Sequence, residues 1–300
     1  MNQKQPFFSI IIPTYARPRQ LAACLQALTR LAYPPQRFEA VVVDDGSENP
    51  LEGVVDPFRN QLNVILLSQP NAGPASARNT GASQAKGTFL AFTDDDCAPA
   101  PDWLKNFAKR FAATPDCAIG GRTLNRLPDN PFSTASQILI DYLYNYYNSD
   151  HNRAQFFASN NLALPKERFL EMGGFDTTFP CAAGEDRELC DRWLNHGRRM
   201  IYAPEALVWH SHSLTGRNFW KQHFGYGRGA YFFQQARLRH GHQRIRLERL
   251  SFYLNLLRAP FRQTISPRAL VLAALLVLSQ GANAAGYFTA SGDIVGCSPH

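Results

Sequence analysis

Residues 88–96 read TFLAFTDDD, and this stretch decides how the fold is interpreted. An apolar, aromatic run long enough for a buried strand ends in three consecutive carboxylates, Asp94, Asp95 and Asp96. Neighbouring anions repel one another, so their ionised state is costly unless water or a cation reaches them. Hard divalent cations take oxygen ligands and keep positions open for substrate phosphates. A solvated turn is the alternative, since Asp also serves in Asx-turns and helix caps.

Further strand-like runs alternate with helix-like segments through the first half of the chain. The apolar runs are 8–12, 38–43, 64–67 and 88–93, and helical spacing occurs at 19–31 and 75–85. Continuous apolar strands separated by helices predict a parallel sheet that is covered on both faces. Ligands of such sheets bind beyond the carboxyl ends of the strands. We therefore expect the polar groups at 14–17, 44–47 and 94–96 along one rim of the sheet.

The second half has a weaker pattern. We expect 122–155 to be irregular and aromatic, and a strand near 156–163. A helix is predicted from Glu185, with Gly197 as its stop. Two short strands are expected after it, at 200–202 and 207–212. In the second of these, His210 and His212 would point the same way, because strand side chains alternate.

Length and composition are those of a globular protein. The chain has 300 residues, of which 45% are hydrophobic and 18% charged. No basic region followed by an apolar core opens the sequence, so we expect no signal peptide. Six cysteines are scattered without metal-ligand spacing, which favours reduced, packed thiols.

The positive charge is concentrated near the C-terminus. Between Arg217 and Arg268 there are eleven Lys and Arg residues and one acid, Glu248, so this stretch carries +10. It is rich in aromatic residues, and a wholly apolar run follows at 269–278, continuing more weakly to 288. A basic helix beside an apolar one is typical of attachment to an anionic membrane surface. We favour interfacial insertion of 269–288 over a full span; a helical subdomain packed on the rest of the protein is the alternative.

Taken together, the polar motifs resemble the family 2 glycosyltransferases, whose catalytic domain has the GT-A fold, an α/β fold with a mostly parallel central sheet flanked by helices. The matching blocks are FSIIIPTY at 8–15, VVVDDGS at 41–47, NAG at 71–73, ARN at 77–79, DDD at 94–96, GGFD at 173–176, GED at 184–186 and WH at 209–210. They stand in the family's order and cover roughly residues 7–215. Thr93 departs from the apolar residue that the family often has there.

The resemblance implies a domain organisation. A GT-A catalytic domain would occupy residues 1–215, with a nucleotide-binding half at about 7–121 and an acceptor half at about 122–215. Residues 216–300 would form a basic, aromatic helical extension, with the membrane-associating segment at 269–288.

The resemblance also implies a nucleotide-diphosphate sugar donor, with a UDP-sugar favoured, a Mg²⁺ or Mn²⁺ ion, and transfer to an acceptor hydroxyl with inversion at the anomeric carbon. The leaving diphosphate develops negative charge, which a bound cation stabilises as a Lewis acid. Asp94 and Asp96 match the family's Asp-x-Asp motif, with Asp96 as a direct ligand. His210, a better positional match than His212, would complete the metal shell or meet the diphosphate; a core or surface histidine is the alternative. Asp95 fills the variable position and is expected to contact the ribose or sugar.

The acceptor hydroxyl needs a general base. The family supplies it from an acidic pair, which here is Glu185 and Asp186, and Asp186 matches the base. Alternatively, carboxylates in a first helical turn only complement the helix dipole, an effect of ~0.3–1 kcal/mol. The catalytic reading requires the cation and Asp186 to face each other across one cavity.

The donor's base and ribose are expected against the first two strand ends. The candidate donor-binding residues are Pro13, Thr14, Tyr15, Arg17, Asp44, Asp45, Arg78, Asp94 and Asp95. Asp44 would accept from a uracil-type N–H. Arg78 matches an arginine that the family places near the nucleotide, although a solvated helix arginine is its alternative.

The basic extension and the aromatic middle section favour a lipid-linked acceptor, or one for surface polysaccharide, with the enzyme on the cytoplasmic side of a membrane. The enzyme would be cytoplasmic if the extension only packs on it. A non-catalytic carbohydrate- or partner-binding protein is disfavoured by the retained acids. A nucleotidyltransferase is disfavoured because no glycine-rich basic loop follows the first strand. Nucleic-acid binding leaves the acidic clusters unexplained, so we expect no nucleic-acid partner.

Overall fold

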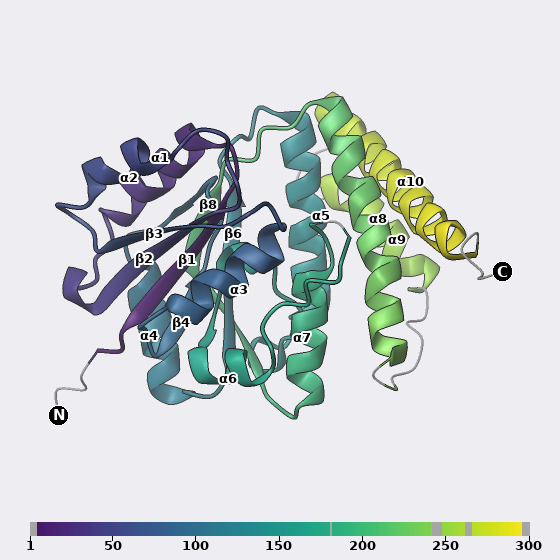
Figure 1. Ribbon diagram of the computed structural model, residues 1–300. Coiled ribbons are helices and arrows are strands. Elements are labelled where there is room, and N and C mark those ends of the chain that lie inside the picture. The colour runs from purple at the N-terminus through teal and green to yellow at the C-terminus, as the bar shows by residue number, and fades with distance from the viewer. Residues whose placement is uncertain (1–4, 181, 240, 242–247, 262–265, 296–300) are drawn as a thin grey trace. The chain divides into compact units, whose positions relative to one another are not determined.

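The computed structural model describes residues 5–180, 182–239, 241, 248–261 and 266–295. Its internal contacts divide the chain into two compact units, coloured along the chain in Figure 1. The first unit comprises residues 1–124, 148–177 and 189–211, and the second comprises 125–147, 178–188 and 212–300. The domain boundaries expected from sequence concern function and stay a prediction.

The first unit is built around a sheet of eight strands in the order β3-β2-β1-β4-β7-β6-β8-β5. The strands are β1 (Phe8–Thr14), β2 (Phe38–Asp44), β3 (Val64–Ser68), β4 (Phe89–Phe92), β5 (Cys97–Pro99), β6 (Ala118–Asn125), β7 (Leu162–Pro165) and β8 (Met200–His210). The helices are α1 (Pro18–Leu28), α2 (Glu52–Val55), α3 (Pro74–Gln84), α4 (Trp103–Ala113) and α6 (Lys166–Glu171). Helix α7 (Glu185–Asn195) begins in the second unit and ends in the first.

The strands β3, β2, β1 and β4 are parallel, as expected from the alternation of strands and helices. Every residue of β1, β2 and β4 is buried, which explains their nearly continuous apolar sequence. Leu21, Cys24 and Leu25 of α1 belong to the core that covers this half. The carboxyl ends of β1, β2 and β4 therefore lie at one edge, where the acidic residues follow.

The other half of the sheet is antiparallel at β4–β7, β7–β6 and β8–β5. The strand expected at 156–163 is wrong in position: β7 is Leu162–Pro165, and a 3-10 turn at Ser159–Asn161 precedes it. The buried side chain of Asn161 fixes this turn, because its amide bonds to Trp103 and to the carbonyls of Arg122 and Ala206.

The two short strands expected after α7 are also wrong, because they form the single strand β8. The expected break fell near Pro204, which has no backbone N–H for a ladder. Strand β5 pairs only with Val208–His210, so Pro204 lies outside that ladder. The strand ends at His210, and His212 lies beyond it, so alternation along one strand does not relate these two histidines.

The second unit is helical and contains α5 (Pro131–Tyr147), α8 (Gly216–Arg239), α9 (Leu250–Arg258) and α10 (Pro267–Val295). The expectation that 122–155 is irregular is therefore wrong, since β6 and α5 occupy much of it. The Asn130 side chain accepts from the Ser133 backbone N–H at 3.0 Å, and Pro131 occupies the first turn. Ala135, Leu139 and Tyr142 are buried at helical spacing.

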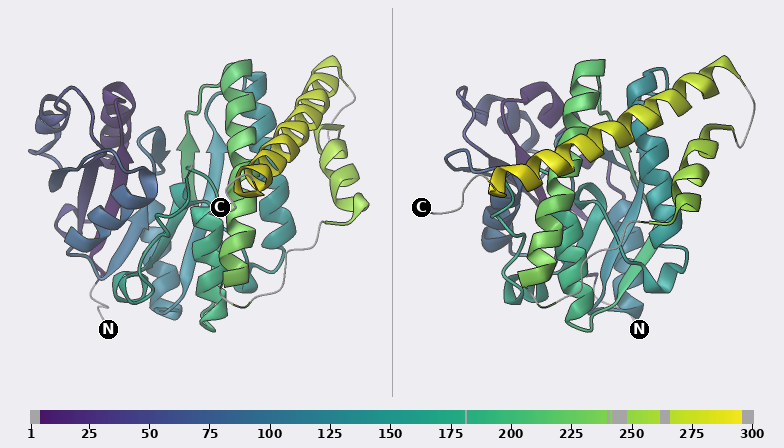
Figure 2. Two further views of the ribbon diagram at one scale, coloured as in Figure 1. Left: turned by 45° about the vertical axis from the view of Figure 1, so that its right-hand side comes forward. Right: turned by 90° about the vertical axis from the view of Figure 1, so that its right-hand side faces the viewer.

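Helices α8 and α10 pack with their backbones close together. A Cβ at Gly227 would lie 1.9 Å from the Asn283 carbonyl oxygen, and one at Gly286 would lie 2.0 Å from that of Phe224. Figure 2 shows α10 lying across α8 within this unit. The described residues include one helix, Pro267–Gly292, long and apolar enough to cross a membrane, with 33% of its most apolar window buried.

Candidate active site

The acids after β4 lie against the ends of β1 and β2, as the sequence predicts. The Thr14 hydroxyl at the end of β1 donates to Asp95 at 2.8 Å. The backbone N–H of Asp45, at the end of β2, donates to the Thr14 carbonyl at 2.9 Å. Because these strands are parallel, their polar carboxyl-terminal residues converge at one rim.

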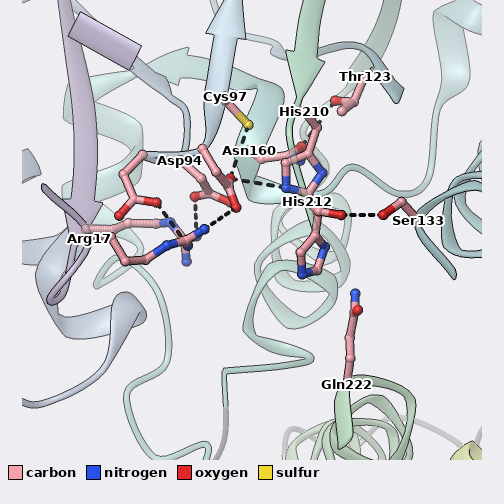
Figure 3. A network of polar contacts seen from close by, with 12 residues as sticks. Arg17, Asp94, Cys97, Thr123, Ser133, Asn160, His210, His212 and Gln222 are labelled. Carbon is pink, nitrogen blue, oxygen red and sulfur yellow. Dashed lines mark hydrogen bonds and ion pairs between the residues drawn. The ribbon is translucent and has the colours of Figure 1, made fainter. Parts of the chain in front are cut away.

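Asp96 lies between an arginine and a histidine. Its Oδ2 is 2.6 Å from an Arg17 guanidinium nitrogen, and its Oδ1 is 3.1 Å from Nε2 of His210. Pairing of β5 with β8 sets Cys97 opposite His210 and so brings the histidine to the acidic stretch. Figure 3 shows Arg17, Asp94, Cys97 and His210 converging. Asp96 and His210 are thus neighbours, and their binding of one cation stays a prediction.

Opposing effects set the protonation of this cluster. Burial acts to raise the pKa of Asp96, but the hydrogen bond and charge of His210, together with Arg17, hold that pKa well below its usual range. Burial acts to lower the pKa of His210, yet Asp96 raises it overall. Burial raises the pKa of Asp95 to about 7 against the opposing effects of Arg17 and Thr14. Asp96 therefore carries a negative charge at neutral pH.

Among the described residues, Asp96, Cys97 and His210 place ligand atoms within 4.8 Å of one another, a spacing that can hold a cation. Burial raises the pKa of the Cys97 thiol well above its ordinary value, so the sulfur stays protonated. It lies 3.9 Å from Asp96 Oδ1 and donates to it. Sulfur is in addition a soft ligand, which Mg²⁺ and Mn²⁺ do not favour. Carboxylate oxygens with an imidazole fit Mn²⁺ or Mg²⁺ better than a soft metal.

Asp94 is paired with an arginine from α3. The Arg78 guanidinium lies 2.8 Å from Asp94 and 5.5 Å from the centre of the Phe175 ring. Arg78 is buried, so the solvated-helix alternative for this residue is excluded. Phe175 is held in turn by Asn79, whose amide exchanges two hydrogen bonds with the Phe175 backbone. The sequence motifs at 77–79 and 173–176 are thus two halves of one support for Asp94.

The two acids after β2 have different surroundings. Asp44 accepts from the Ser47 backbone N–H at 3.0 Å and from the Ser47 hydroxyl at 2.5 Å. Asp45 accepts from the backbone N–H groups of Ala72 and Gly73, at 2.9 and 2.8 Å, and from the Gln69 amide. Asp45 therefore fixes the loop that leads into α3. Its contact with a donor stays a prediction.

The residues expected around the donor's base follow β1. Pro13 and Thr14 are buried, whereas Tyr15 is half exposed. Ala16 has a φ of 53°, a left-handed conformation uncommon outside glycine, and its N–H bonds to the Ser47 hydroxyl. This turn directs Arg17 toward Asp95 and Asp96, at 3.0 and 2.6 Å.

Asp186 and Glu185 lie in the first turn of α7, within the second unit. Glu185 is buried, and the Asp186 Oδ1 accepts from the Arg187 backbone N–H at 2.7 Å. Gly184 has a φ of 94°, and a Cβ there would lie 2.9 Å from the Gly229 carbonyl. A glycine is therefore required at position 184 by the backbone conformation and by the packing on α8.

Arg187 anchors the segment that carries Asp186. Its guanidinium lies over the rings of Tyr147 and Phe233, at 5.6 and 5.0 Å from their centres. The placement of Asp186 opposite the cation, which the sequence predicts, stays a prediction.

No role was predicted from the sequence for Cys97, and Ser47 was included only as a member of the polar group at 44–47. Cys97 directly follows the acidic stretch, and Ser47 follows the two acids of β2, so proximity to a motif was the available signal. Their contribution depends on which side of the chain they face, and this is set by strand pairing.

The sequence of residues 9–174, more than half of the chain, matches the model of the Glycosyl transferase family 2. The chain belongs to this family. The expectation of a glycosyltransferase is therefore confirmed, and the nucleotidyltransferase and non-catalytic alternatives are not supported. This family 2 glycosyltransferase is 27% identical to glycosyltransferase AglE of Haloferax volcanii, over 76% of the chain and 74% of AglE. It is 29% identical to the pre-mycofactocin glycosyltransferase of Mycobacterium tuberculosis, over 68% of the chain but 44% of that relative.

Solved structures of similar fold confirm the GT-A expectation for this family 2 glycosyltransferase. The mannosyltransferase PcManGT from Pyrobaculum calidifontis, in complex with GDP-Man and Mn²⁺, has a TM-score of 0.63 at 20% identity, covering 99% of this chain and 82% of PcManGT. S. aureus TarS 1-349 in complex with UDP-GlcNAc has a TM-score of 0.54 at 18% identity, covering 97% of this chain and 92% of that TarS fragment.

Proposed function

We propose that this glycosyltransferase binds the diphosphate of a nucleotide sugar through a Mg²⁺ or Mn²⁺ ion held by Asp94, Asp96 and His210. The observation that carries the proposal is the position of Asp96, which has His210 at one oxygen and Arg17 at the other. When bound, the cation would supply Lewis-acid stabilisation of the leaving diphosphate. The complex of PcManGT with Mn²⁺ supports a cation on this fold.

Two arginines would have different tasks in donor binding. Arg17 is about two-fifths exposed, so it can exchange a carboxylate for a phosphate oxygen. Arg78 is buried beneath Asp94 and acts by orienting that carboxylate. The base and ribose would lie against Pro13, Thr14, Tyr15 and Asp44, which follow β1 and β2. Asp95, which accepts from the Thr14 hydroxyl at 2.8 Å, would meet a hydroxyl of the donor.

Transfer would proceed with inversion, and Asp186 would remove the proton of the acceptor hydroxyl. Its position in the first turn of α7 is fixed through Gly184 and Arg187. Glu185 is buried beside it and would support its orientation. A base of this kind contributes about 10²–10⁴-fold in rate.

The nucleotide and the acceptor are assigned by class. Relatives of this fold are solved with GDP-Man and with UDP-GlcNAc, so the fold accommodates either base. A UDP-sugar fits an acceptor such as Asp44 for the uracil N–H. The acceptor would be a hydroxyl on a lipid-linked saccharide, and the enzyme would lie on the cytoplasmic face of a membrane through residues from about 217 onward. Another relative, with 26% identity, is the glucosyl-dolichyl phosphate glucuronosyltransferase of Haloferax volcanii.

A panel of nucleotide sugars screened by thermal shift, with and without Mn²⁺, tests the donor proposal. A ligand that binds only the folded state raises the unfolding temperature. We expect one nucleotide class to raise it in the presence of Mn²⁺ and to lose this effect with EDTA. Equal shifts with and without the cation would refute the role assigned to Asp94, Asp96 and His210.

A further inference from the structure

Helix α10 presents two faces of different kind. Towards α5 and α8 it buries Leu272, Leu276, Ala282 and Ala290. On its other side, between residues 269 and 288, every exposed side chain is apolar or a glycine. These exposed residues are Leu270, Val271, Ala274, Val277, Leu278, Gly281, Ala284 and Phe288. Their spacing of three and four residues makes them one continuous stripe along the helix.

The polar residues of α10 do not interrupt this stripe. The Ser279 hydroxyl is buried and donates to the Leu276 carbonyl at 2.7 Å, and the Gln280 amide bonds to Ser279. Tyr287 bonds through its hydroxyl to Gln234 of α8. The backbone carbonyl of Asn283 lies at the close approach to Gly227. The polar residues Ser279, Gln280, Asn283 and Tyr287, which weaken the apolar pattern in the sequence, therefore lie outside the exposed stripe.

The packing with α8 opposes a transmembrane orientation. Contacts join the two helices from Phe219 and Leu272 to the rings of Tyr231 and Tyr287, whose centres are 5.5 Å apart. Helix α8 carries five basic residues, Arg217, Lys221, Arg228, Arg237 and Arg239. Carrying such residues into hydrocarbon is strongly unfavourable. A span would require α10 to separate from α8 and to expose the tight Gly227–Gly286 packing.

The positive charge near the stripe favours an anionic lipid surface, and not a second copy of the chain, as its partner. Arg268 is exposed at the first turn of α10, and Arg258 is exposed at the end of α9, which packs on α10 through Leu256 and Leu276. The sequence from 217 to 268 carries +10. Two such surfaces repel each other, whereas anionic headgroups attract each of them.

We propose that α10 lies in the plane of an anionic membrane surface and inserts the stripe from Leu270 to Phe288, without crossing the bilayer. The proposal rests on the membrane attachment put forward above and assigns the face that makes it. Leu270 is 60% exposed, Val277 56% and Phe288 70%, so one side of the helix can enter the headgroup boundary over its length. The catalytic unit would then be held at the surface where lipid-linked acceptors lie.

Co-sedimentation of the full chain with phosphatidylcholine vesicles, with and without phosphatidylglycerol, tests the surface. We expect binding only to the anionic vesicles. Leu270→Glu should weaken it by about tenfold or more, because an inserted apolar side chain is lost and a negative charge is added. Leu170→Glu is the matched control, since Leu170 is 44% exposed on α6 of the other unit, and it should leave binding unchanged. Equal binding by both variants would overturn the assignment of the stripe.

Depth separates in-plane insertion from a span. Tryptophan introduced at Leu270, Val277 or Phe288 should be quenched equally by lipids brominated near the headgroup, after subtraction of the parent signal. Deepest quenching at Val277 alone would mean a span and would overturn the proposal. A dimer in solution that dissociates in Leu270→Glu while vesicle binding persists would assign the stripe to a second copy instead.

Donor hydrolysis by Leu270→Glu in vesicle-free solution distinguishes this proposal from the proposed function. Hydrolysis retained with vesicle binding lost supports the membrane face. An active parent chain that never binds vesicles removes the membrane inference but leaves the glycosyltransferase assignment. Vesicle binding without Mn²⁺-dependent hydrolysis of any nucleotide sugar would count against the donor proposal alone.

Discussion

The carboxylate of Asp96 and the imidazole of His210 lie 3.1 Å apart, although β5 through β8 separate them in the sequence. The second oxygen of Asp96 lies 2.6 Å from Arg17. Burial would favour the neutral acid, but these two partners hold the pKa of Asp96 well below its usual range. The residue proposed to bind the cation is thus an anion at neutral pH.

Removing Asp96 should eliminate cation-dependent donor binding. In Asp96→Ala, the Mn²⁺-dependent rise in unfolding temperature with nucleotide sugar should disappear, because the shared anion of the site is lost. Asp56→Ala is a suitable control, since Asp56 pairs on the surface with Arg59 only three residues away. A full Mn²⁺-dependent shift in Asp96→Ala would exclude Asp96 as a ligand.

Arg17 competes with a cation for the same carboxylates. We expect Arg17→Met to bind Mn²⁺ about tenfold more tightly without donor, since a positive charge next to Asp95 and Asp96 is gone. The same variant should bind nucleotide sugar more weakly, because the arginine also faces the diphosphate. Calorimetric titration with Mn²⁺ alone measures the first effect, with Arg59→Met as control. Weaker Mn²⁺ binding in Arg17→Met would contradict this competition.

Asp186→Asn should separate binding from transfer. The amide keeps the shape of the carboxylate but cannot take a proton, so transfer should fall by about 10²–10⁴-fold. The donor-induced thermal shift should stay near that of the parent, because Asp186 is proposed to act on the acceptor. Near-normal transfer by Asp186→Asn would remove it as the base.

His223 should make the folded state sensitive to mild acid. It is buried on α8, its ring lies 3.2 Å from the Ser136 hydroxyl, and burial, together with His212, lowers its pKa to about 4. Between about pH 6.5 and 4 the unfolded chain binds this proton and the folded chain does not. The stabilisation is complete above 6.5 and is lost as the pH falls, by roughly 3 kcal/mol at most.

Chemical denaturation across this pH range measures the effect of His223. In His223→Gln the free energy of unfolding should depend less on pH than in the parent. His196→Gln, at an exposed position in the turn after α7, should keep the parent's pH dependence. An unchanged dependence in His223→Gln would show that this histidine is protonated equally in both states.

Two glycines of α8 should respond oppositely to the same substitution. A Cβ at Gly227 would meet the Asn283 carbonyl at 1.9 Å, whereas one at Gly225 meets nothing within 4 Å. Gly227→Ala should therefore destabilise the protein by about 1–3 kcal/mol through overpacking. Gly225→Ala should stabilise it by about 0.5–1 kcal/mol, because alanine favours the helix. Equal free energies of unfolding for the two variants would contradict the close packing of α8 on α10.

Patterned segments of the sequence were enough to predict the nucleotide-binding half of the fold. Strands β1, β2 and β4 are buried on both faces, so their sequences are almost wholly apolar and end at polar residues. Helix α5 was missed because its tyrosines resemble an aromatic loop, while its cap at Asn130 is a short signal. Strand β8 runs unbroken through Pro204, which lies outside its pairing with β5 at Val208–His210, and such pairing is not visible in the sequence.

By itself, the sequence determined the chemistry: which acids follow which strands, that the family is a glycosyltransferase family, and that a basic, apolar segment ends the chain. Only the tertiary structure decided that His210 rather than His212 meets Asp96, that Cys97 donates to it as a thiol, and that the exposed side of α10 from Leu270 to Phe288 is apolar. These outcomes depend on strand pairing and helix packing between residues far apart in the chain. The sequence specifies which groups are present, whereas the distances between groups far apart in the chain are set only by folding.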